Sequence, residues 1–140
     1  MHSGDRLEAI SDLNVLIKNM KPKIALAEYV FCVVSEAKFR LMNIKPICTF
    51  REREGVTAII DKASADSNGI HYTGTWKLIS ISIYSDLHSI GFLAAITAKL
   101  AEAGISVNIV SAYHHDHLFV PLEKAQACMQ LLKKMSEEVG

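Results

Sequence analysis

The residues most able to do chemistry form one short run, Tyr113-His114-His115-Asp116-His117. Four of its members can ligate a metal ion, and in an extended chain His115 and His117 project from the same face, as two ligands of one ion should. A structural zinc ion needs about four protein ligands and a catalytic one about three. Cys48 and His71 can complete the set only if the fold brings them near. We favour a different interpretation, a polar hairpin whose imidazoles hydrogen-bond at a module interface.

Other charged or glycine-containing stretches carry no enzymatic signature. The run Arg51-Glu52-Arg53-Glu54 alternates in charge, which is typical of a solvated hairpin rather than of a paired-carboxylate site. The segment from Gly69 to Gly74 has two glycines but no GxGxxG pattern, and no nucleophile elbow or phosphate-binding loop occurs elsewhere. We therefore predict a protein without catalytic activity and without a cofactor.

A second candidate site lies at the start of a predicted helix, Leu87–Ala103. The first amides of a helix lack intrahelical partners and lie at the positive end of its dipole, so they can cradle a carboxylate. Asp86 can then pair with an ammonium group, Gly91 permits close approach to the backbone, and Asn108 offers both a donor and an acceptor. An amino acid carries both charged groups. The same residues also have a structural explanation, since Asp86 and Ser89 can cap the helix. Gly91 can equally serve helix packing, and Asn108 can satisfy a strand edge.

Hydrophobic periodicity predicts the elements of the first half. Apolar residues at helical spacing follow Ser11 and stop at Pro22, and the β-branched and aromatic run Tyr29–Val34 predicts a strand. Two more strands and a brief helix follow, with the turn Glu54–Gly55 between the strands and Asn68–Gly69 closing the helix: Ile44–Arg53, Val56–Asp61 and Lys62–Ser67.

The second half is predicted to run strand, helix, strand, strand, helix. Trp76–Tyr84 alternates, with Ile79, Ile81 and Ile83 on one oily face. The helix Leu87–Ala103 places Leu93, Ile96, Leu100 and Ala103 toward the core, and Gly104 caps it. Two strands then flank the turn His114–His117, and Pro121 opens a last helix; these elements are Ile105–Tyr113, Leu118–Val120 and a helix lined by Leu122, Ala125, Met129 and Leu132.

Length and composition indicate one compact unit or two small fused modules. The chain has 140 residues, half of them apolar, with seven glycines and three prolines. A module of ~65 residues buries too little surface to be stable alone, so the halves should pack together and with a second chain. We therefore expect a homodimer or a higher homo-oligomer.

The charge balance excludes two classes of partner. Fifteen basic and fifteen acidic residues give a formal net charge of zero, which does not suit a protein that binds nucleic acid or an anionic membrane. No apolar run approaches the ~20 residues of a membrane span, and charged residues within Met1–Ile10 argue against a signal peptide. The sequence thus predicts a cytoplasmic protein. Cys32, Cys48 and Cys128 are far apart and set in apolar sequence, which indicates reduced core residues.

Residues Ser85–Ile96 and Leu100–Ile109 resemble the ACT domain, a small regulatory module of amino-acid metabolism. The resemblance covers Trp76 to about Lys134 and rests on a glycine at the helix start, a Leu-Ala pair and a strand that opens Gly-Ile-x-x-Asn-Ile. The commonest form of the motif has an acid three residues before the glycine and a proline just before it; here those positions are His88 and Ile90. Residues 12–69 resemble a degenerate partner module, as in small tandem ACT-like proteins and the paired regulatory modules of aspartate kinases.

The resemblance implies an α+β fold of two ferredoxin-like modules, residues 1–72 and 73–140, with antiparallel sheets and helices packed on one face. It implies allosteric regulation by an amino acid or related small molecule, bound at a module or subunit interface. The ligand-binding residues that it implies are Asp86, His88, Ser89, Ile90, Gly91, Asn108 and Ile109. The second module lacks a final strand after its last helix. The first half must supply this strand, or the module has one strand fewer. Two alternatives stay open, a metal-dependent enzyme or metal-binding protein using His114–His117, and an interaction module without a ligand.

Overall fold

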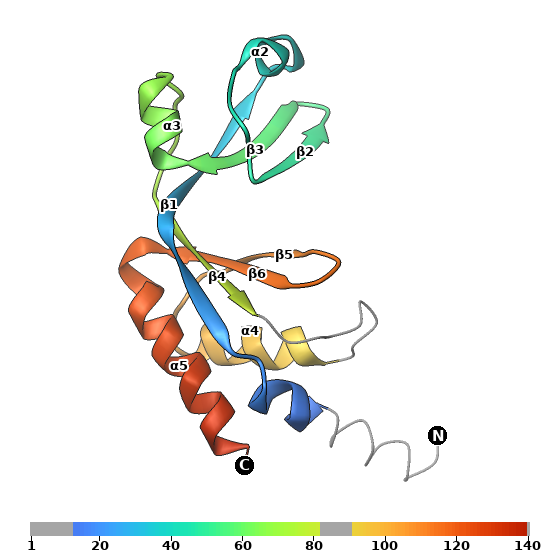
Figure 1. Cartoon of the computed structure of the whole chain (residues 1–140), viewed down its shortest axis with the longest axis vertical. Helices are drawn as coiled ribbons and strands as arrows, with labels where there is room; N and C mark the ends of the chain where they lie inside the picture. The colour runs from blue at the N-terminus through green and yellow to red at the C-terminus, as the bar shows by residue number, and fades with distance from the viewer. Residues whose placement is uncertain (1–12, 82–90, 140) are drawn as a thin grey trace. The chain divides into compact units, whose positions relative to one another are not determined.

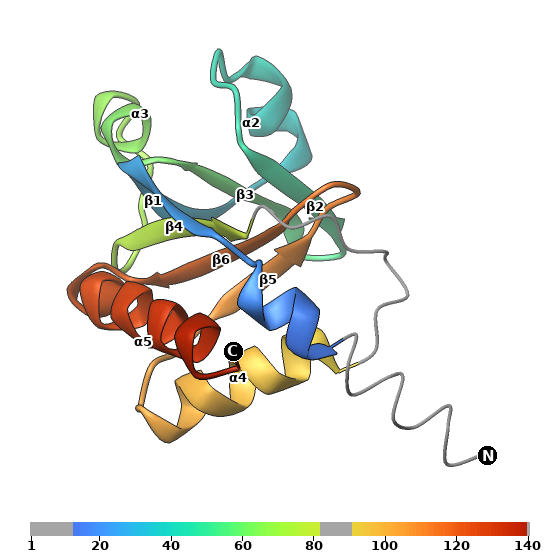
Figure 2. The ribbon, with the colours of Figure 1, turned by 60° about the horizontal axis from the view of Figure 1, so that its bottom comes forward.

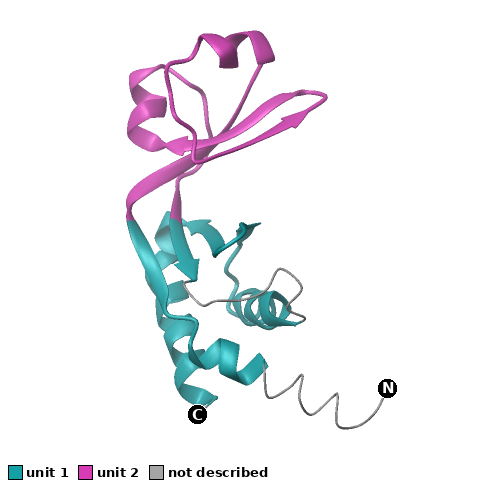
Figure 3. Cartoon of the chain, turned by 45° about the vertical axis from the view of Figure 1, so that its right-hand side comes forward, with its two compact units in different colours: residues 1–25, 78–140 teal, residues 26–77 magenta. Residues whose placement is uncertain are grey.

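The computed structural model describes residues 13–81 and 91–139, and the chain divides into two compact units (Figure 3). Unit 1 comprises residues 1–25 and 78–140, and unit 2 comprises residues 26–77. Neighbouring strands are hydrogen-bonded in the order β2-β3-β1-β4-β6-β5 (Figure 1). The module boundary between residues 72 and 73 was drawn from the repeated sequence pattern and stays a prediction. The two units described here are instead defined by contacts in the structure.

Unit 2 follows the strand and helix order predicted for the first half, with one addition. Its elements are the larger part of β1 (Pro22–Val34), α2 (Glu36–Leu41), β2 (Cys48–Glu52), β3 (Gly55–Asp61) and α3 (Lys62–Ser67). The helix α2 was not predicted, because none of its six residues is buried and it has no apolar stripe. It is nucleated instead by a cap, since the Ser35 side chain accepts a hydrogen bond from the Lys38 amide at 3.1 Å.

The turn of the β2–β3 hairpin depends on Gly55. Its φ of 147° lies in a region that side-chain-bearing residues avoid. A Cβ atom there would stand 2.7 Å from the carbonyl oxygen of Val34, on the strand paired with β3. The predicted hairpin is therefore confirmed, but its turn is Arg53–Glu54 rather than Glu54–Gly55, because Gly55 already pairs with Glu52 as the first residue of β3. The glycine is needed for two independent reasons.

The core of unit 2 is small. Antiparallel pairing places Val30 opposite Ile60 and Cys32 opposite Ala58, with all four side chains buried. Ala65 of α3 and Ile70 complete a cluster of six buried residues in the described chain. The cluster contains two alanines and no large aromatic side chain, so this unit buries little apolar volume.

Unit 1 has longer helices over its strands, and α4 and α5 lie side by side (Figures 1 and 2). Its elements are a helical segment at residues 13–18, the first residues of β1, β4 (Trp76–Ile81), α4 (Phe92–Glu102), β5 (Asn108–Ser111), β6 (Asp116–Pro121), the 3-10 helix η1 (Leu122–Lys124) and α5 (Ala125–Glu138). Fifteen buried residues of the described chain form its core, among them Phe92, Ile96, Leu100 and Leu132.

The strand missing from the second half comes from the start of the chain. Residues 22–25 belong to unit 1, and β1 is the neighbour of β4 in the strand order. Unit 1 thus has the order β1-β4-β6-β5, and unit 2 has the equivalent order β2-β3-β1-β4. The predicted α+β fold of ferredoxin-like modules is confirmed, with the completing strand drawn from the N-terminal segment.

Several predicted boundaries in the second half are wrong. The helix α4 begins at Phe92 rather than Leu87, because Gly91 at a φ of 84° is its N-cap. The strand β5 begins at Asn108 rather than Ile105, because the Ile105 amide still bonds the Leu100 carbonyl in the helix-closing turn. Asp116 and His117 lie in β6 rather than in the turn.

The last helix and its core stripe also need correction. Pro121 ends β6, and the helix α5 starts only at Ala125, after the 3-10 turn. As a result Leu122 is 41% exposed, although Ala125, Met129 and Leu132 are buried as predicted. In the predicted stripe of α4, Ile96 and Leu100 are buried, Leu93 is half-buried, and Ala103 is exposed; Phe92 is buried instead. Ile83, predicted for the oily face of β4, lies outside the described residues.

Two of the three cysteines fill cores, as predicted. Cys32 and Cys128 are buried and free, and burial raises the pKa of the Cys128 thiol to about 11. Cys48 is also free but only half-buried, because it lies on β2, at one end of the strand order. Within the described ranges, none of the helices is both long and apolar enough to span a bilayer.

Candidate functional site

The polar candidates of unit 1 lie on the strand face that its helices do not cover. Ile79, Ile81, Leu118 and Val120 belong to the helix-covered core, so alternation turns Ser80 and His117 to the opposite face. Ile109 packs against the same core, and alternation therefore turns Asn108 away from it. One face of these strands thus packs under the helices, and the other carries Ser80, His117 and Asn108 together with the buried Leu78 and Phe119.

The start of α4 is an uncapped cluster of backbone donors. Gly91 has no side chain to cap the helix, and its carbonyl accepts the amide of Ala95 at 2.9 Å. Within the described residues, no acceptor takes the amides of Phe92, Leu93 or Ala94. A Cβ atom at Gly91 would meet its nearest neighbour, Leu13 Cδ2, only at 3.9 Å, so the backbone is open to approach. The geometry can accept an anion.

Three of the seven predicted ligand residues fall within the described chain, namely Gly91, Asn108 and Ile109. Asn108 is exposed at the first position of β5 and pairs with Phe119, whereas Ile109 is half-buried and pairs with Leu118. The polar side chain of Asn108 is therefore available, and that of Ile109 contributes mainly to packing. Asp86, His88, Ser89 and Ile90 lie outside the described residues.

The histidine hairpin, residues 113–117, is anchored by one hydrogen bond to a neighbouring strand. Ser80 Oγ and His117 Nδ1 are 2.7 Å apart. Burial, followed by the nearby charge of His115, lowers the pKa of His117 below its ordinary value, and Asp116 opposes this effect. The His117 ring thus has Nδ1 engaged with Ser80, and its burial favours the neutral form. The alternation of residues 76–84 puts Ser80 on the face opposite Ile79 and Ile81, but no local pattern indicates its partner.

The other imidazoles of the hairpin form a chain of ring contacts. The ring centroids of His115 and His117 are 6.1 Å apart, those of His114 and His115 are 6.4 Å apart, and the Tyr113 ring meets His114 at 5.0 Å. Across residues 13–81 and 91–139, no three His, Cys, Asp or Glu side chains are grouped as a metal site would require. The arrangement is that of a polar hairpin whose rings meet edge-on or tilted.

The histidine hairpin adjoins the end of β4 that leads toward α4. Ser80 is one residue from the end of β4 at Ile81, and it contacts His117 near the start of β6. Asn108 lies at the far end of the β5–β6 ladder, since Ser111 rather than Asn108 pairs with Asp116. Among the described residues, Asn108 and the Ser80–His117 pair therefore lie at separate places in unit 1.

The alternating charges of residues 51–54 form the solvated hairpin that was predicted. All four side chains are exposed. Arg51 Nε donates to Glu36 Oε1 at 3.2 Å, and its guanidinium lies 5.8 Å from the centre of the Phe39 ring. Glu52 Oε1 accepts the Thr57 hydroxyl at 2.7 Å. These contacts attach α2 to the hairpin and leave no pair of carboxylates facing a common space.

Comparison with known proteins gives a consistent family. Two models described as ACT domain match residues 8–77 and 73–134. A crystal structure of a protein of unknown function from Vibrio cholerae, described as a possible transport protein, is 38% identical, with a TM-score of 0.83 over 91% of this chain and 98% of that one. No curated protein sequence matches.

Regulatory parts of aspartate kinases share the fold at low identity. The ligand-free regulatory subunit from Thermus thermophilus is 12% identical, with a TM-score of 0.62 over 81% of this chain and 95% of that one. The aspartate kinase of Clostridium acetobutylicum is 11% identical, with a TM-score of 0.64 over 84% of this chain but only 34% of the enzyme. At such identities the likeness concerns the fold.

Proposed function

Because this chain belongs to the ACT-domain family, we propose that it is a regulatory protein without catalytic activity that binds an amino acid. ACT domains are small-molecule-binding regulatory modules, and this chain carries two of them in tandem. The fold shared with the regulatory subunit of an aspartate kinase supports an allosteric role. The enzyme or pathway it would regulate is left to experiment.

The observation that carries the proposal is the start of α4, where Gly91 supplies no side-chain cap. The amides of Phe92, Leu93 and Ala94 have no acceptor in the described chain, and Gly91 leaves the backbone accessible. An amino-acid carboxylate can accept these amides at the positive end of the helix dipole. Asp86 is the proposed partner of the ammonium group, and His88, Ser89 and Ile90 are proposed to complete the wall.

Asn108 and Ile109 are proposed to contribute from β5 at a module or subunit interface. Asn108 lies at the far end of the ladder from the histidine hairpin, so it suits a ligand that bridges two modules or two copies of the chain. A ligand that bridges packed modules favours one arrangement over another through its differential affinity, which is a population shift. Regulation then needs no catalytic group.

A homo-oligomer is the second part of the proposal. The strand β2 lies at one end of the strand order and carries Phe50, which is 70% exposed, next to Ile47, which is 48% exposed. An edge strand with exposed apolar side chains presents unpaired backbone groups on which another chain can pair. Sedimentation equilibrium should give the mass of at least two chains, and a mass of one chain would contradict this part.

A thermal-shift screen with the natural amino acids tests ligand binding. A ligand at ~100 times its dissociation constant should add ~2.7 kcal/mol to the free energy of unfolding. Asn108→Ala should abolish the shift while leaving the melting temperature of the free protein unchanged, because its side chain is exposed. Ser111→Ala, an exposed position at the other end of β5, is the matched control and should retain the shift. If no amino acid shifts the transition, the chain is an interaction module instead.

A further inference from the structure

Unit 2 contains a hollow beside β1 that the proposed amino-acid site does not use. The unit-2 groove has a volume of about 430 Å³. That is within the range of small-molecule sites, about 300–1,000 Å³. It is lined by Phe31, Cys32, Val33, Val34, Lys38, Thr57, Ile70, His71, Tyr72 and Thr73. Half of these side chains are apolar, so the groove suits a ligand with a hydrocarbon part.

One wall of the groove is held in place by contacts outside it. Ile70 is buried in the core of unit 2, and its amide donates to the Ala65 carbonyl at 2.9 Å. Tyr72 packs against the same core, and its hydroxyl donates to Asp66 Oδ1 at 2.6 Å. His71 and Thr73 alternate with these anchored residues and are exposed. The wall is therefore fixed, with its polar side chains left available.

The groove is basic in character. Lys38 and His71 line it, and neither has a carboxylate partner among the described residues. No Asp or Glu lines it. Two carboxylates lie just behind the lining: Asp66, which also accepts Lys62 Nζ at 2.9 Å, and Glu52, which accepts the Thr57 hydroxyl. Both are already bonded, so the ammonium group of Lys38 has no counter-charge inside the groove.

Cys32 contributes an apolar surface rather than a nucleophile. Its thiol donates to the Ala58 carbonyl at 3.5 Å. Burial raises the pKa of the Cys32 thiol, the Ala58 contact lowers it, and the charge of Lys38 lowers it in turn.

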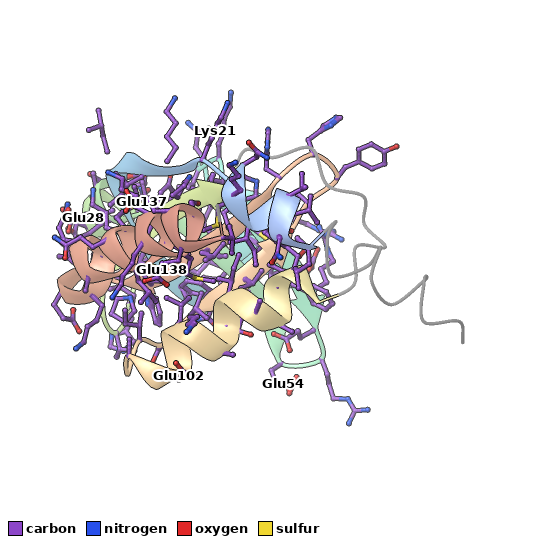
Figure 4. The ribbon with its side chains drawn as sticks, turned by 90° about the horizontal axis from the view of Figure 1, so that it is seen from below. Lys21, Glu28, Glu54, Glu102, Glu137 and Glu138 are labelled. Atoms are coloured by element: carbon purple, nitrogen blue, oxygen red, sulfur yellow. The ribbon has the colours of Figure 1, made fainter. Side chains whose placement is uncertain are left out.

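Two other hollows of the described chain are lined by acidic as well as basic side chains. The hollow along α4 and α5 is lined by Lys99 and Lys134, whose ion-pair partners Glu102 and Glu138 also line it, at N–O distances of 3.9 and 3.8 Å. Figure 4 shows Glu102 on α4 and Glu138 on α5. A second hollow near the start of β1 is lined by Lys62 together with three acids, Glu28, Asp61 and Asp66. Only the unit-2 groove among these three combines basic side chains with no acidic one.

We propose that the unit-2 groove binds a small monocarboxylate that has an apolar body and no ammonium group. Its carboxylate bonds Lys38 and His71, and its hydrocarbon part lies against Phe31, Val33 and Ile70. An ammonium group would find no carboxylate in the groove and would face two basic side chains, so the amino-acid analogue is disfavoured. The proposed ligand therefore differs in charge from the amino acid proposed for unit 1.

Isocaproate and leucine form a matched pair of probes, because they share a carbon skeleton and a carboxylate but only leucine has an ammonium group. Trp76 is the single tryptophan of the chain, and its ring lies 5.5 Å from that of Phe31, so its fluorescence reports on the groove. Titration of the whole protein with isocaproate or with hexanoate should change this fluorescence saturably. Leucine should bind at least about tenfold more weakly at this reporter.

Variants of one exposed lysine complete the test. Lys38→Gln should weaken isocaproate binding about tenfold or more, because a charge-assisted hydrogen bond is lost, and Lys38→Arg should retain most of the affinity. Lys45→Gln removes the same charge from an exposed position outside the groove and should have no effect. The proposal is overturned if neither monocarboxylate saturates the signal, if leucine binds as tightly, or if Lys38→Gln leaves affinity unchanged. Asn108→Ala should not affect this signal, which separates it from the amino-acid site.

Discussion

The two units share one strand plan and differ in the depth of their cores. In unit 1 the helices α4 and α5 have 11 and 14 residues and cover fifteen buried side chains of the described chain. In unit 2 the helices α2 and α3 have six residues each, and the cluster beneath them has six buried members. The same topology is thus stabilised by very different amounts of buried apolar surface.

The difference indicates a division of labour. A deep core resists local opening, whereas a unit with a small core opens at lower free-energy cost. Unit 1 therefore holds the backbone donors of α4 in a fixed place. Unit 2 is the part whose packing a bound ligand can shift most easily.

Matched truncations in the two cores should give the largest effects. Ile79 of β4 and Ile60 of β3 are both strand residues with no exposed surface. Ile79→Ala should lower the free energy of unfolding by about 3–5 kcal/mol, and Ile60→Ala by about 2–3 kcal/mol, because the smaller core collapses more readily around the cavity. Urea unfolding followed by circular dichroism measures both. Equal losses, or a larger loss at Ile60, would remove the contrast between the cores.

Replacing one glycine in each unit by alanine should change stability by an intermediate amount. Gly55→Ala in unit 2 combines an unfavourable φ with a clash against the Val34 carbonyl, and should cost about 2–3 kcal/mol. Gly104→Ala in unit 1 has a φ of 72° and open space around it, so it should cost only about 1 kcal/mol. The melting temperatures of the two variants test the order, and a more damaging Gly104→Ala would show that the clash is relieved without cost.

The smallest expected effect is a pH dependence of stability caused by His117 of unit 1. Burial lowers the pKa of His117 in the folded state below its ordinary value of about 6.5. At mildly acidic pH the unfolded chain then binds more protons than the folded one. The contribution of His117 to the free energy of unfolding is therefore complete above pH ~6.5, and it is lost as the pH falls through the lower pKa of the folded state. His117→Gln should flatten this dependence in denaturant titrations from neutral to mildly acidic pH. His71→Gln, at an exposed position in unit 2, should not, and an unchanged slope in His117→Gln would refute the assignment.

Local signals predicted unit 2 well where a cap or turn marks an element. The helix Lys62–Ser67 was predicted with its observed bounds, because Asp61 caps its start and Asn68–Gly69 closes it. The helix α2 was not predicted, because none of the residues that follow its Ser35 cap is buried and they show no apolar periodicity. Short elements stabilised by surface contacts, such as the Arg51–Glu36 pair, leave no hydrophobic period in the sequence.

The candidate site was predicted in type but not in arrangement. The glycine at the start of α4 is recognisable in sequence, yet its left-handed conformation, which delays the helix to Phe92, depends on the chain around it. The hydrogen bond between Ser80 and His117 joins residues 37 positions apart in the sequence. The start of β1 is separated from its neighbour β4 by still more residues. Such long-range register is set by packing, so no local pattern encodes it.

Amide hydrogen exchange with the amino acid selected by the thermal-shift screen tests the central claim most directly. The account predicts that saturating ligand slows exchange at the amides of Phe92, Leu93 and Ala94, and that Asn108→Ala removes this protection. Protection confined to residues 26–77, or the absence of any protection at the start of α4, would contradict it.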